Sequence, residues 1–312
     1  MVEPSLIALD WGTSSLRAYL LGADGATVLD SRAEPWGIMQ MPAADFGTTF
    51  EEVTGAWRAR WPALASIACG MIGSNRGWVT VPYCPCPAGE GELAATLAPL
   101  RGGALHIVAG IAQTGDSPDV MRGEETQIIG ALDVHPEFAA ESLLVLPGTH
   151  SKWVRVLEGK VRNFATYMTG ELFTVLRDHS ILGRPPKDAH HEPDVVAADA
   201  AFARGVLAAR ASANGIAPLL FSARALVLAE RLEPETSLDY VSGLLIGDEL
   251  RCGLMGGVHP SALIGDTALC RRYVIALGLF GVNDIPVVDG SAARGLWRIA
   301  RHARLAIANE HT

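Results

Sequence analysis

The sequence predicts an α/β protein with two domains, each of which begins with strands and ends with helices. The chain has 312 residues, which exceeds the usual size of a single hydrophobic core. One strand–turn–strand pattern occurs twice, about 140 residues apart. After each copy, patterns typical of helices follow, and in places they alternate with short strand patterns, as in α/β proteins. We therefore expect a domain over residues 1–138 and another over residues 139–312.

The first copy opens the chain. Residues 6–10 are an apolar strand, Trp11-Gly12-Thr13-Ser14-Ser15 is a tight turn, and residues 16–21 alternate like a half-buried strand. A second turn at Asp24-Gly25 leads into another strand, so we predict a meander of strands over residues 5–10, 15–21 and 26–31.

The rest of the first half is predicted to alternate between helices and strands. Phe46, Phe50, Val53 and Trp57 fall on one side of a predicted helix over residues 45–61. Further predicted elements are a strand at 66–69, a glycine-rich loop at 70–77, a helix at 93–100, a strand at 105–109 and a helix from Glu124.

The second copy surrounds Pro147-Gly148-Thr149-His150-Ser151-Lys152, with a second turn at Glu158-Gly159. It predicts strands over 143–146, 153–157 and 161–167. The remaining pattern predicts helices at 195–213, 222–232 and 237–254, a strand at 262–265, a helix at 266–280, a strand at 286–288 and a closing helix from Ser291.

Composition excludes several classes of function. The formal charge of −9 argues against a general binder of nucleic acid or of membrane surfaces. No apolar run approaches the length that crosses a bilayer, and no leader precedes the first strand, so we expect a cytoplasmic protein. The five cysteines are scattered, and the close pair in Cys84-Pro85-Cys86 is more typical of a packed loop than of a metal or redox site.

The two glycine turns are candidate phosphate cradles. Such turns expose backbone N–H groups and hydroxyls with little side-chain bulk, although most glycine turns only reverse the chain. Arg17 and Lys152 lie on or beside strands, where they either add positive charge or are simply solvated. The candidate phosphate ligands are Gly12, Thr13, Ser14, Arg17, Gly148, Thr149, His150, Ser151 and Lys152.

Asp10 closes the first apolar strand directly before a turn. A carboxylate at the end of a buried strand suits a Mg²⁺ ion, which prefers oxygen ligands. The alternative is a carboxylate that only caps the turn.

Several segments together carry a family resemblance. Asp10-Trp11-Gly12-Thr13-Ser14 and Pro147 to Lys152 resemble the two phosphate motifs of the actin-like ATPase superfamily, and Leu263-Ile264-Gly265-Asp266 resembles its adenosine motif. Further motifs are similar to the 2-dehydro-3-deoxygalactonokinase family: Met71-Ile72-Gly73-Ser74, Gly77-Trp78, Pro82-Tyr83, Cys86-Pro87, Met121 to Gln127, Met168-Thr169-Gly170-Glu171 and Phe221-Ser222-Ala223-Arg224. This resemblance spans nearly the whole chain.

The resemblance implies an actin-like (ribonuclease H-like) fold with a cleft between its domains, and an activity. The expected reaction is ATP- and Mg²⁺-dependent phosphorylation of 2-keto-3-deoxygalactonate at O6, in galactonate breakdown. Gly265 and Asp266 would then approach the adenosine. The expected partner is this small sugar acid, bound by a monomer or a homodimer.

The resemblance also places a catalytic carboxylate at Arg122-Gly123-Glu124-Glu125. One glutamate would take the proton of the sugar hydroxyl, and the sequence leaves open which one; acidic residues in a first helical turn also simply complement the helix dipole. Arg122 pairs either with the substrate carboxylate or with these glutamates. For recognition of the sugar acid, the loop offers Ser74, Asn75, Arg76, Trp78 and Tyr83.

Two other functions use the same motifs. A phosphohydrolase would use Glu124 or Glu125 to activate water in place of a sugar hydroxyl. A non-catalytic nucleotide clamp would need longer insertions or an appended domain, for which this chain leaves little room.

Overall fold

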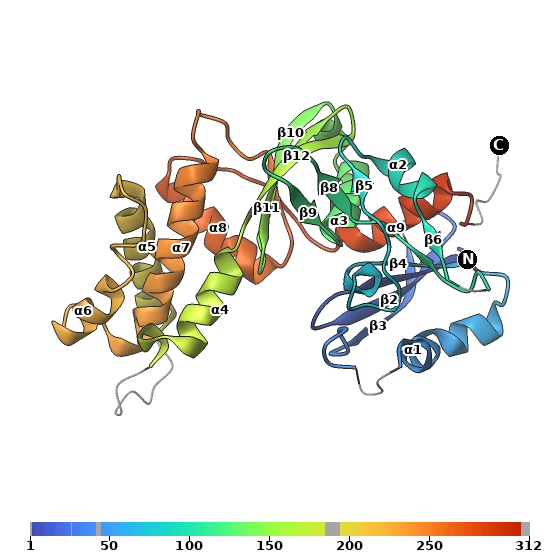
Figure 1. Ribbon diagram of the computed structural model, residues 1–312, viewed down its shortest axis with the longest axis horizontal. Helices are drawn as coiled ribbons and strands as arrows, with labels where there is room; N and C mark the ends of the chain where they lie inside the picture. Colours follow the sequence, from blue (N-terminus) through green and yellow to red (C-terminus); the bar gives the residue numbers. More distant parts are fainter. Residues whose placement is uncertain (1, 26, 42–44, 101, 185–193, 307–312) are drawn as a thin grey trace. The chain divides into compact units, whose positions relative to one another are not determined.

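The computed structural model describes residues 2–25, 27–41, 45–100, 102–184 and 194–306. The chain forms two compact units (Figure 1). The first unit contains Met1–Leu144, Val154–Phe164 and Val288–Thr312, and the second contains Val145–Trp153 and Ala165–Val287. The predicted boundary between residues 138 and 139 divides the chain into consecutive pieces, whereas in the structure the C-terminal segment belongs to the first unit.

The first unit is built on a six-stranded sheet in the order β3-β2-β1-β4-β7-β6. Its strands are β1 (Pro4–Trp11), β2 (Leu16–Gly22), β3 (Val28–Glu34), β4 (Ser66–Cys69), β6 (Ala98–Pro99) and β7 (His106–Ile107). The first three strands form the predicted antiparallel meander, except that Ala26 lies outside the described residues. β4 runs parallel to β1, and Asp10 lies in register with Cys69. The carboxyl ends of these two strands therefore meet at one edge of the sheet.

The helix α1 (Phe46–Arg60) confirms the prediction for residues 45–61. Asp45 caps it by accepting hydrogen bonds from the N–H groups of Gly47 and Thr48. The prediction of a helix over 93–100 is wrong: α2 (Glu90–Ala95) begins earlier and stops before β6. Pro99 accounts for the early stop, because proline cannot donate within a helix and holds the preceding residue extended.

A small sheet of β5 (Cys84–Pro85), β8 (Ile111–Gln113) and β9 (Asp119–Met121) precedes α3 (Glu124–Val134). Its strands have two or three residues each, too few for a periodic pattern, and the sequence did not predict them. The helix α3 begins at Glu124, as expected.

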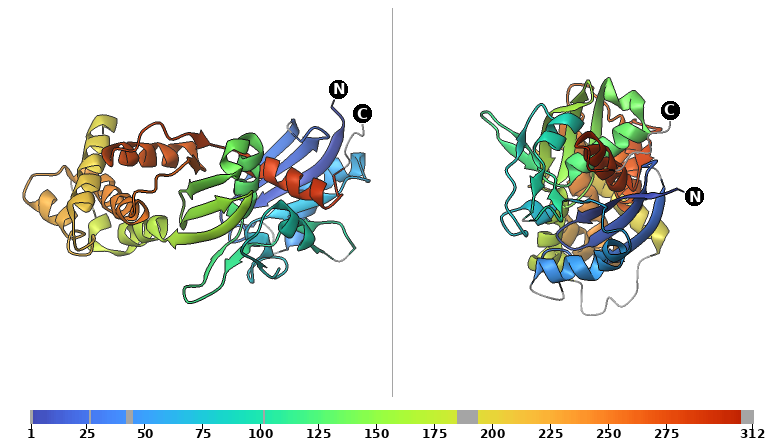
Figure 2. Two further views of the ribbon diagram at one scale, coloured as in Figure 1. Left: turned by 90° about the horizontal axis from the view of Figure 1, so that it is seen from above. Right: turned by 90° about the vertical axis from the view of Figure 1, so that its right-hand side faces the viewer.

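The C-terminal helix α9 (Ser291–His302) packs against α3 and the sheet of the first unit (Figure 2). The two helix backbones approach closely. A Cβ atom on Gly130 would lie 1.9 Å from the carbonyl oxygen of Ser291, and one on Gly295 would lie 1.9 Å from that of Thr126. Glycine at both positions is what allows this packing.

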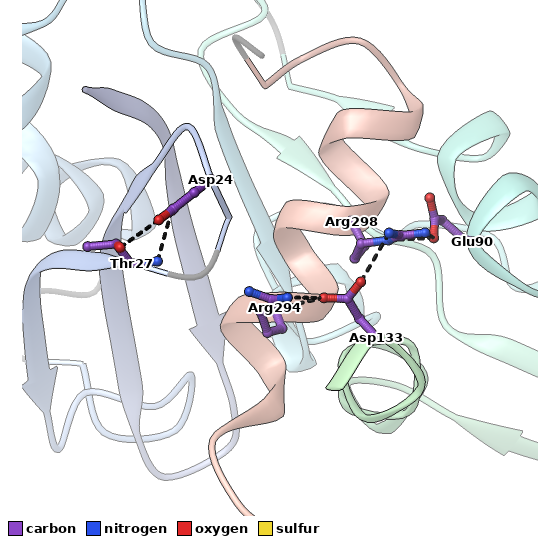
Figure 3. Close-up of polar contacts among 6 residues, drawn as sticks. All are labelled: Asp24, Thr27, Glu90, Asp133, Arg294 and Arg298. Atoms are coloured by element: carbon purple, nitrogen blue, oxygen red, sulfur yellow. Dashed lines mark hydrogen bonds and ion pairs between the residues drawn. The ribbon is translucent and has the colours of Figure 1, made fainter. Parts of the chain in front are cut away.

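Ion pairs flank the glycine contact (Figure 3). Asp133 of α3 accepts from Arg294 Nε at 2.6 Å and from Arg298 Nη1 at 3.0 Å, and Arg298 also pairs with Glu90 of α2. Three helices of the first unit are thereby joined. In the same view, Asp24 closes the turn between β2 and β3 by accepting from Thr27.

The second sheet has five strands in the order β12-β11-β10-β13-β14. Its strands are β10 (Glu141–Leu146), β11 (Ser151–Leu157), β12 (Lys160–Tyr167), β13 (Ala262–Ile264) and β14 (Val287–Val288). These strands confirm the second copy of the strand–turn–strand pattern.

Helices make up most of the second unit. They are α4 (Thr169–His179), α5 (Val195–Ala211), α6 (Ser222–Leu228), α7 (Ser237–Gly253) and α8 (Thr267–Leu279), and α5, α6 and α4 pack on α7 (Figure 1). The sequence predicted all of them except α4, although α6 ends four residues before the expected position. Among the described residues, no helix is long and apolar enough to span a membrane.

Candidate active site

The first cluster of predicted site residues lies where β1 and β4 end and α3 begins. Asp10 accepts a hydrogen bond from the Cys69 thiol, at 3.8 Å between Oδ1 and Sγ. Burial raises the pKa of Asp10, and Arg17, its partner across the β1–β2 ladder, acts in the opposite direction. The pKa of Cys69 is well above its usual value because of burial and the nearby charges of Asp10 and Glu125. Asp10 and Glu125 are thus both neighbours of one buried thiol.

Two glycines bring these three backbones together. Gly70 follows β4 with φ +91°, and a Cβ atom there would lie 2.7 Å from the carbonyl oxygen of Trp11. Gly123 precedes α3 with φ +109° and faces Gly70. Any other residue would be strained at these positive φ angles. Glycine at both positions therefore allows the three backbones to approach one another.

The adjacent glutamates at the start of α3 have different surroundings. The Glu125 carboxylate accepts from Gly123 N–H at 2.6 Å and from the Thr126 hydroxyl at 3.1 Å. Burial and then the charge of Glu124 raise the pKa of Glu125 to about 8. Glu124 accepts from the Arg122 N–H at 2.9 Å. The Glu125 side chain is fully buried, whereas Glu124 is half-buried.

Backbone hydrogen bonds fix the first glycine turn, and its side chains are exposed. Gly12 N–H donates to the Ser15 carbonyl at 2.9 Å, and residues 38 and 39 donate to the carbonyls of Gly12 and Thr13. Thr13, Ser14 and Arg17 are exposed. The turn therefore presents its hydroxyls at the surface of the first unit.

Arg122 is a half-buried cation with unused donors. Its Nη2 donates to the Val81 carbonyl at 2.7 Å, and its guanidinium lies 4.3 Å from the centre of the Tyr83 ring. Its Nε and Nη1 atoms are buried and have no hydrogen-bond partner among the described residues. The guanidinium does not pair with the glutamates among the ion pairs found in the described chain. Two unused N–H groups on a planar cation suit a carboxylate.

The other predicted substrate residues are arranged less compactly. Ser74 is buried and accepts from the Arg76 N–H at 3.2 Å, while Asn75 and Arg76 are exposed. Trp78 stacks on Phe46 of α1 at 6.2 Å and borders a hollow of about 1050 Å³ beside that helix. Of the predicted substrate residues, Tyr83 therefore stacks on Arg122, whereas Trp78 packs on α1.

The second glycine turn borders a cavity of about 330 Å³ within the second unit. Gly148 and Thr149 line it together with the first residues of α4, Thr169 and Gly170. A Cβ atom on Gly170 would lie 2.5 Å from the Gly148 carbonyl oxygen, so glycine allows this close approach. A helix N-terminus beside a glycine turn favours an anion.

Ser151 and Lys152 follow this turn, and their side chains form hydrogen bonds within the protein. Both are buried, Ser151 fully. Ser151 Oγ accepts from Gly148 N–H at 3.4 Å and lies 2.9 Å from the Tyr273 hydroxyl, and Lys152 donates to Thr166 at 2.8 Å. His150 is exposed and pairs with Glu171. A direct contact of these three side chains with phosphate stays a prediction.

The predicted adenosine motif lies beside the second turn. A Cβ atom on Gly265 would lie 3.6 Å from the Pro147 carbonyl oxygen, and Asp266 caps α8 by accepting from the Leu269 N–H. The cavity wall itself comes from residues that the sequence analysis missed. These are Phe173, Leu238, Asp239, Ser242, Leu245, Ile246, Leu269, Arg272 and Tyr273.

One signal in the sequence could have indicated this wall. Arg271 and Arg272 interrupt the mostly apolar sequence of α8, and Arg272 pairs with Asp239 of α7 at 2.5 Å. The two residues are 33 positions apart, so only the folded helices reveal the pair.

No group of three or more histidine, cysteine or acidic side chains in the described part of the chain forms a metal cage. Mg²⁺ does not require one, because it usually binds through one or two carboxylates, waters and substrate phosphates. Asp10 is a half-buried carboxylate that accepts a long hydrogen bond from a thiol, and it fits that requirement.

Comparison of the sequence with known proteins finds one family of kinases. The family model for 2-keto-3-deoxy-galactonokinase matches residues 10–299. The chain is 39% identical over 306 residues to a probable 2-dehydro-3-deoxygalactonokinase of Rhizobium meliloti, covering 93% of this chain and 97% of that protein. It is 35% identical over 302 residues to the 2-dehydro-3-deoxygalactonokinase of Escherichia coli, covering 95% and 97%.

Solved structures agree in fold. A crystal structure from Sinorhizobium meliloti, described as a candidate 2-dehydro-3-deoxygalactonokinase, has a TM-score of 0.84 at 34% identity and covers 95% of this chain and 98% of that one. The activator of 2-hydroxyisocaproyl-CoA dehydratase from Clostridium difficile, solved with ADPNP, has a TM-score of 0.51 at 12% identity, with 96% of each chain covered. This second likeness concerns the fold alone.

Proposed function

The chain belongs to the 2-keto-3-deoxy-galactonokinase family, and from this premise we propose that it transfers the γ-phosphoryl group of ATP to O6 of 2-keto-3-deoxygalactonate. The products are ADP and 2-keto-3-deoxy-6-phosphogalactonate. The fold is the actin-like α/β fold that the sequence predicted.

The observation that carries the substrate assignment is Arg122. Arg122 is half-buried, and its two buried N–H donors without partners are costly unless a ligand supplies acceptors. The carboxylate of a sugar acid supplies two. The stacked Tyr83 ring helps to hold the planar guanidinium in its orientation.

We assign the general base to Glu124. A base must reach the proton that it removes, and the Glu125 side chain is fully buried whereas Glu124 is partly exposed. The Glu124 carboxylate accepts the proton of the O6 hydroxyl while O6 forms its bond to the γ-phosphorus. The bond from that phosphorus to the bridging oxygen breaks, and its electron pair leaves with ADP. Glu125 holds the backbone of Gly123 and so positions Glu124.

Asp10 is the residue that would hold Mg²⁺, at the end of β1 and next to the exposed turn of Thr13 and Ser14. The ion, when bound with ATP, neutralises charge on the phosphate oxygens. Asp10 itself contributes a fixed carboxylate whose only hydrogen-bond donor among the side chains of the described residues is a thiol.

The cavity of the second unit suits the nucleoside of ATP. Its volume of about 330 Å³ lies at the lower end of the usual range of ligand pockets. Gly148, Thr149 and the N-terminus of α4 at one side are suited to phosphate. Apolar and polar residues of α4, α7 and α8 line the rest, including the Asp239–Arg272 pair.

A coupled assay for ADP tests this function directly. With ATP and Mg²⁺, we expect ADP release to depend on 2-keto-3-deoxygalactonate and to be near zero without it. Phosphorus NMR of the product should show a phosphate ester at O6. ADP release that is equally fast without the sugar acid would instead indicate the phosphohydrolase.

A further inference from the structure

A buried carboxylate lies behind the second glycine turn. Glu249 of α7 is only 3% exposed. It accepts hydrogen bonds from three side chains: Trp153 Nε1 at 2.8 Å, the Tyr273 hydroxyl at 2.7 Å and the Thr169 hydroxyl. Its partners come from β11, α8 and α4, so one carboxylate joins four elements of the second unit.

The hydrogen bonds have a fixed direction. The Tyr273 hydroxyl donates to Glu249, so its single proton is used in that bond. The bond of 2.9 Å between Tyr273 and Ser151 must then be donated by Ser151. The Ser151 oxygen is left to accept from the Gly148 N–H. A chain of donors therefore runs from the glycine turn through Ser151 and Tyr273 to Glu249.

We propose that Glu249 is a positioning residue for nucleotide binding, which holds the Gly148–Thr149 turn and the cavity wall in their binding geometry through Ser151, Tyr273 and Thr169. The nucleotide assignment of this cavity rests on the proposed function. Glu249 touches no ligand in this account, and it acts through residues that do line the cavity, namely Gly148, Thr169 and Tyr273.

A purely structural role explains the arrangement less well. Removing a carboxylate from water is costly, and an apolar side chain of similar size usually serves a core as well or better. Burial raises the pKa of Glu249, and the hydrogen bonds from Thr169, Trp153 and Tyr273 oppose that effect. The protein therefore retains a costly buried carboxyl group at a place where two of its hydrogen-bonded partners, Thr169 and Tyr273, line the cavity.

The chain offers a matched pair of tyrosines for the test. Tyr273 and Tyr240 are both buried in the second unit, and each hydroxyl bonds to a serine: Tyr273 to Ser151 at 2.9 Å and Tyr240 to Ser222 at 3.0 Å. Only Tyr273 belongs to the chain of donors that ends at Glu249. Tyr240→Phe is therefore the control for Tyr273→Phe.

The measurement is the dissociation constant of ADP by titration calorimetry, without sugar acid, together with the melting temperature. We expect Tyr273→Phe and Glu249→Gln to weaken ADP binding by on the order of tenfold, the scale for a lost hydrogen bond to a charged group. Tyr240→Phe should change ADP binding less than about twofold while lowering the melting temperature as much as Tyr273→Phe does.

A double substitution separates positioning from direct contact. If Ser151 acts through Tyr273, the Ser151→Ala and Tyr273→Phe losses overlap, and the double variant binds ADP about as well as the weaker single variant. Losses that add fully, or an ADP affinity for Tyr273→Phe equal to that of Tyr240→Phe, would overturn the proposal. The single and double variants decide the matter even if Glu249→Gln does not fold.

The outcome is independent of the sugar acid. A protein that binds ADP with these variant effects but does not phosphorylate 2-keto-3-deoxygalactonate would refute the proposed function and leave the role of Glu249 intact.

Discussion

Glu124 and Glu125 are neighbours in the sequence, and burial gives them different roles. We expect Glu124→Gln to lower kcat by on the order of a hundredfold or more, which is the usual contribution of a general base. The KM for ATP should stay nearly constant, because Glu124 acts on the acceptor hydroxyl. Steady-state kinetics at saturating concentrations of both substrates measure the effect.

Glu125→Gln is the companion variant. It keeps a group of the same shape that can still accept from Gly123 N–H, so its kcat should fall less than that of Glu124→Gln. The opposite order would reverse our assignment of the base.

The raised pKa of Glu125 also predicts how stability changes with pH. The folded protein keeps the proton up to about pH 8, whereas the unfolded chain releases it near the ordinary value of 4.5. Stability from this group is therefore complete below pH 4.5 and is lost as the pH rises through about 8. The Glu125→Gln variant cannot ionise and lacks this loss.

Urea unfolding without Mg²⁺ or nucleotide tests the sign. Between pH 5 and pH 9 the free energy of unfolding of the natural protein should fall relative to that of Glu125→Gln. The difference between the two should change by on the order of a few kcal/mol. Parallel stability curves across this range would show that the Glu125 carboxyl is not held neutral.

Arg122 has a close structural match elsewhere in the first unit. Arg32 also donates to a carbonyl, that of Val53 at 2.6 Å, and also stacks on an aromatic ring, that of Trp57 at 4.9 Å. We expect Arg122→Met to raise the KM for the sugar acid by on the order of tenfold or more, because a charge-assisted carboxylate contact is lost. Arg32→Met should leave both KM values unchanged.

The assignment of Arg122 would fail if its substitution raised the KM for ATP and left that for the sugar acid unaltered. Arg122→Lys adds a finer comparison. Lysine keeps the charge but not the planar pair of donors. The KM of Arg122→Lys for the sugar acid should therefore lie between that of the natural protein and that of Arg122→Met.

At the scale of elements, the crossing of α3 and α9 depends on two glycines. In Gly295→Ala the new Cβ would lie 1.9 Å from the carbonyl oxygen of Thr126, and backbone cannot yield as a flexible side chain does. We expect a loss of unfolding free energy of about 1–3 kcal/mol or more. Gly55→Ala in α1 is the control, because its nearest neighbour is the Glu51 carboxylate at 3.5 Å.

The two substitutions should have opposite signs. Alanine favours a helix over glycine by up to about 1 kcal/mol where space permits, so Gly55→Ala should be neutral or stabilising. Chemical denaturation measures both. Equal effects would mean that helix propensity, and not the close approach of α3 and α9, determines the result at Gly295.

Prediction of the elements from sequence succeeded where local signals are strong. The helices α1 and α8, capped by Asp45 and Asp266, and the strands around both glycine turns were located within a few residues. The prediction of a helix at 93–100 was wrong because Pro99 cannot continue a helix, and α2 ends before it. β5, β8 and β9 have two or three residues each, and β5 pairs with β8 from a different part of the sequence, so no local pattern reveals them.

At the scale of the whole chain, the C-terminal segment completes the first unit. Leu296, Ile299 and Ala300 of α9 are fully buried there. A chain ending at residue 287 should lose cooperative unfolding of that unit, because its apolar core would face water. A chain ending at residue 306, which keeps α9, should unfold as the full chain does. Circular dichroism during heating would show the difference, and identical transitions would contradict it.

The motifs of the sequence indicated the family by resemblance. Strand alternation and turn residues indicated the α/β fold and the place of the two glycine turns, because these signals act over a few neighbouring positions. The sequence also indicated Asp10, Arg122 and the glutamate pair as site residues. Their roles stayed open at that stage, because burial and hydrogen-bond partners do not follow from position in the chain.

Only the tertiary structure decided what surrounds each of these side chains. It buries Glu125 and leaves Glu124 partly exposed, and it leaves two Arg122 donors without partners in the described protein. It also brings Glu249 to Trp153, which lies 96 positions away. Charge, desolvation and hydrogen bonding depend on distances in space, and packing of whole elements sets those distances.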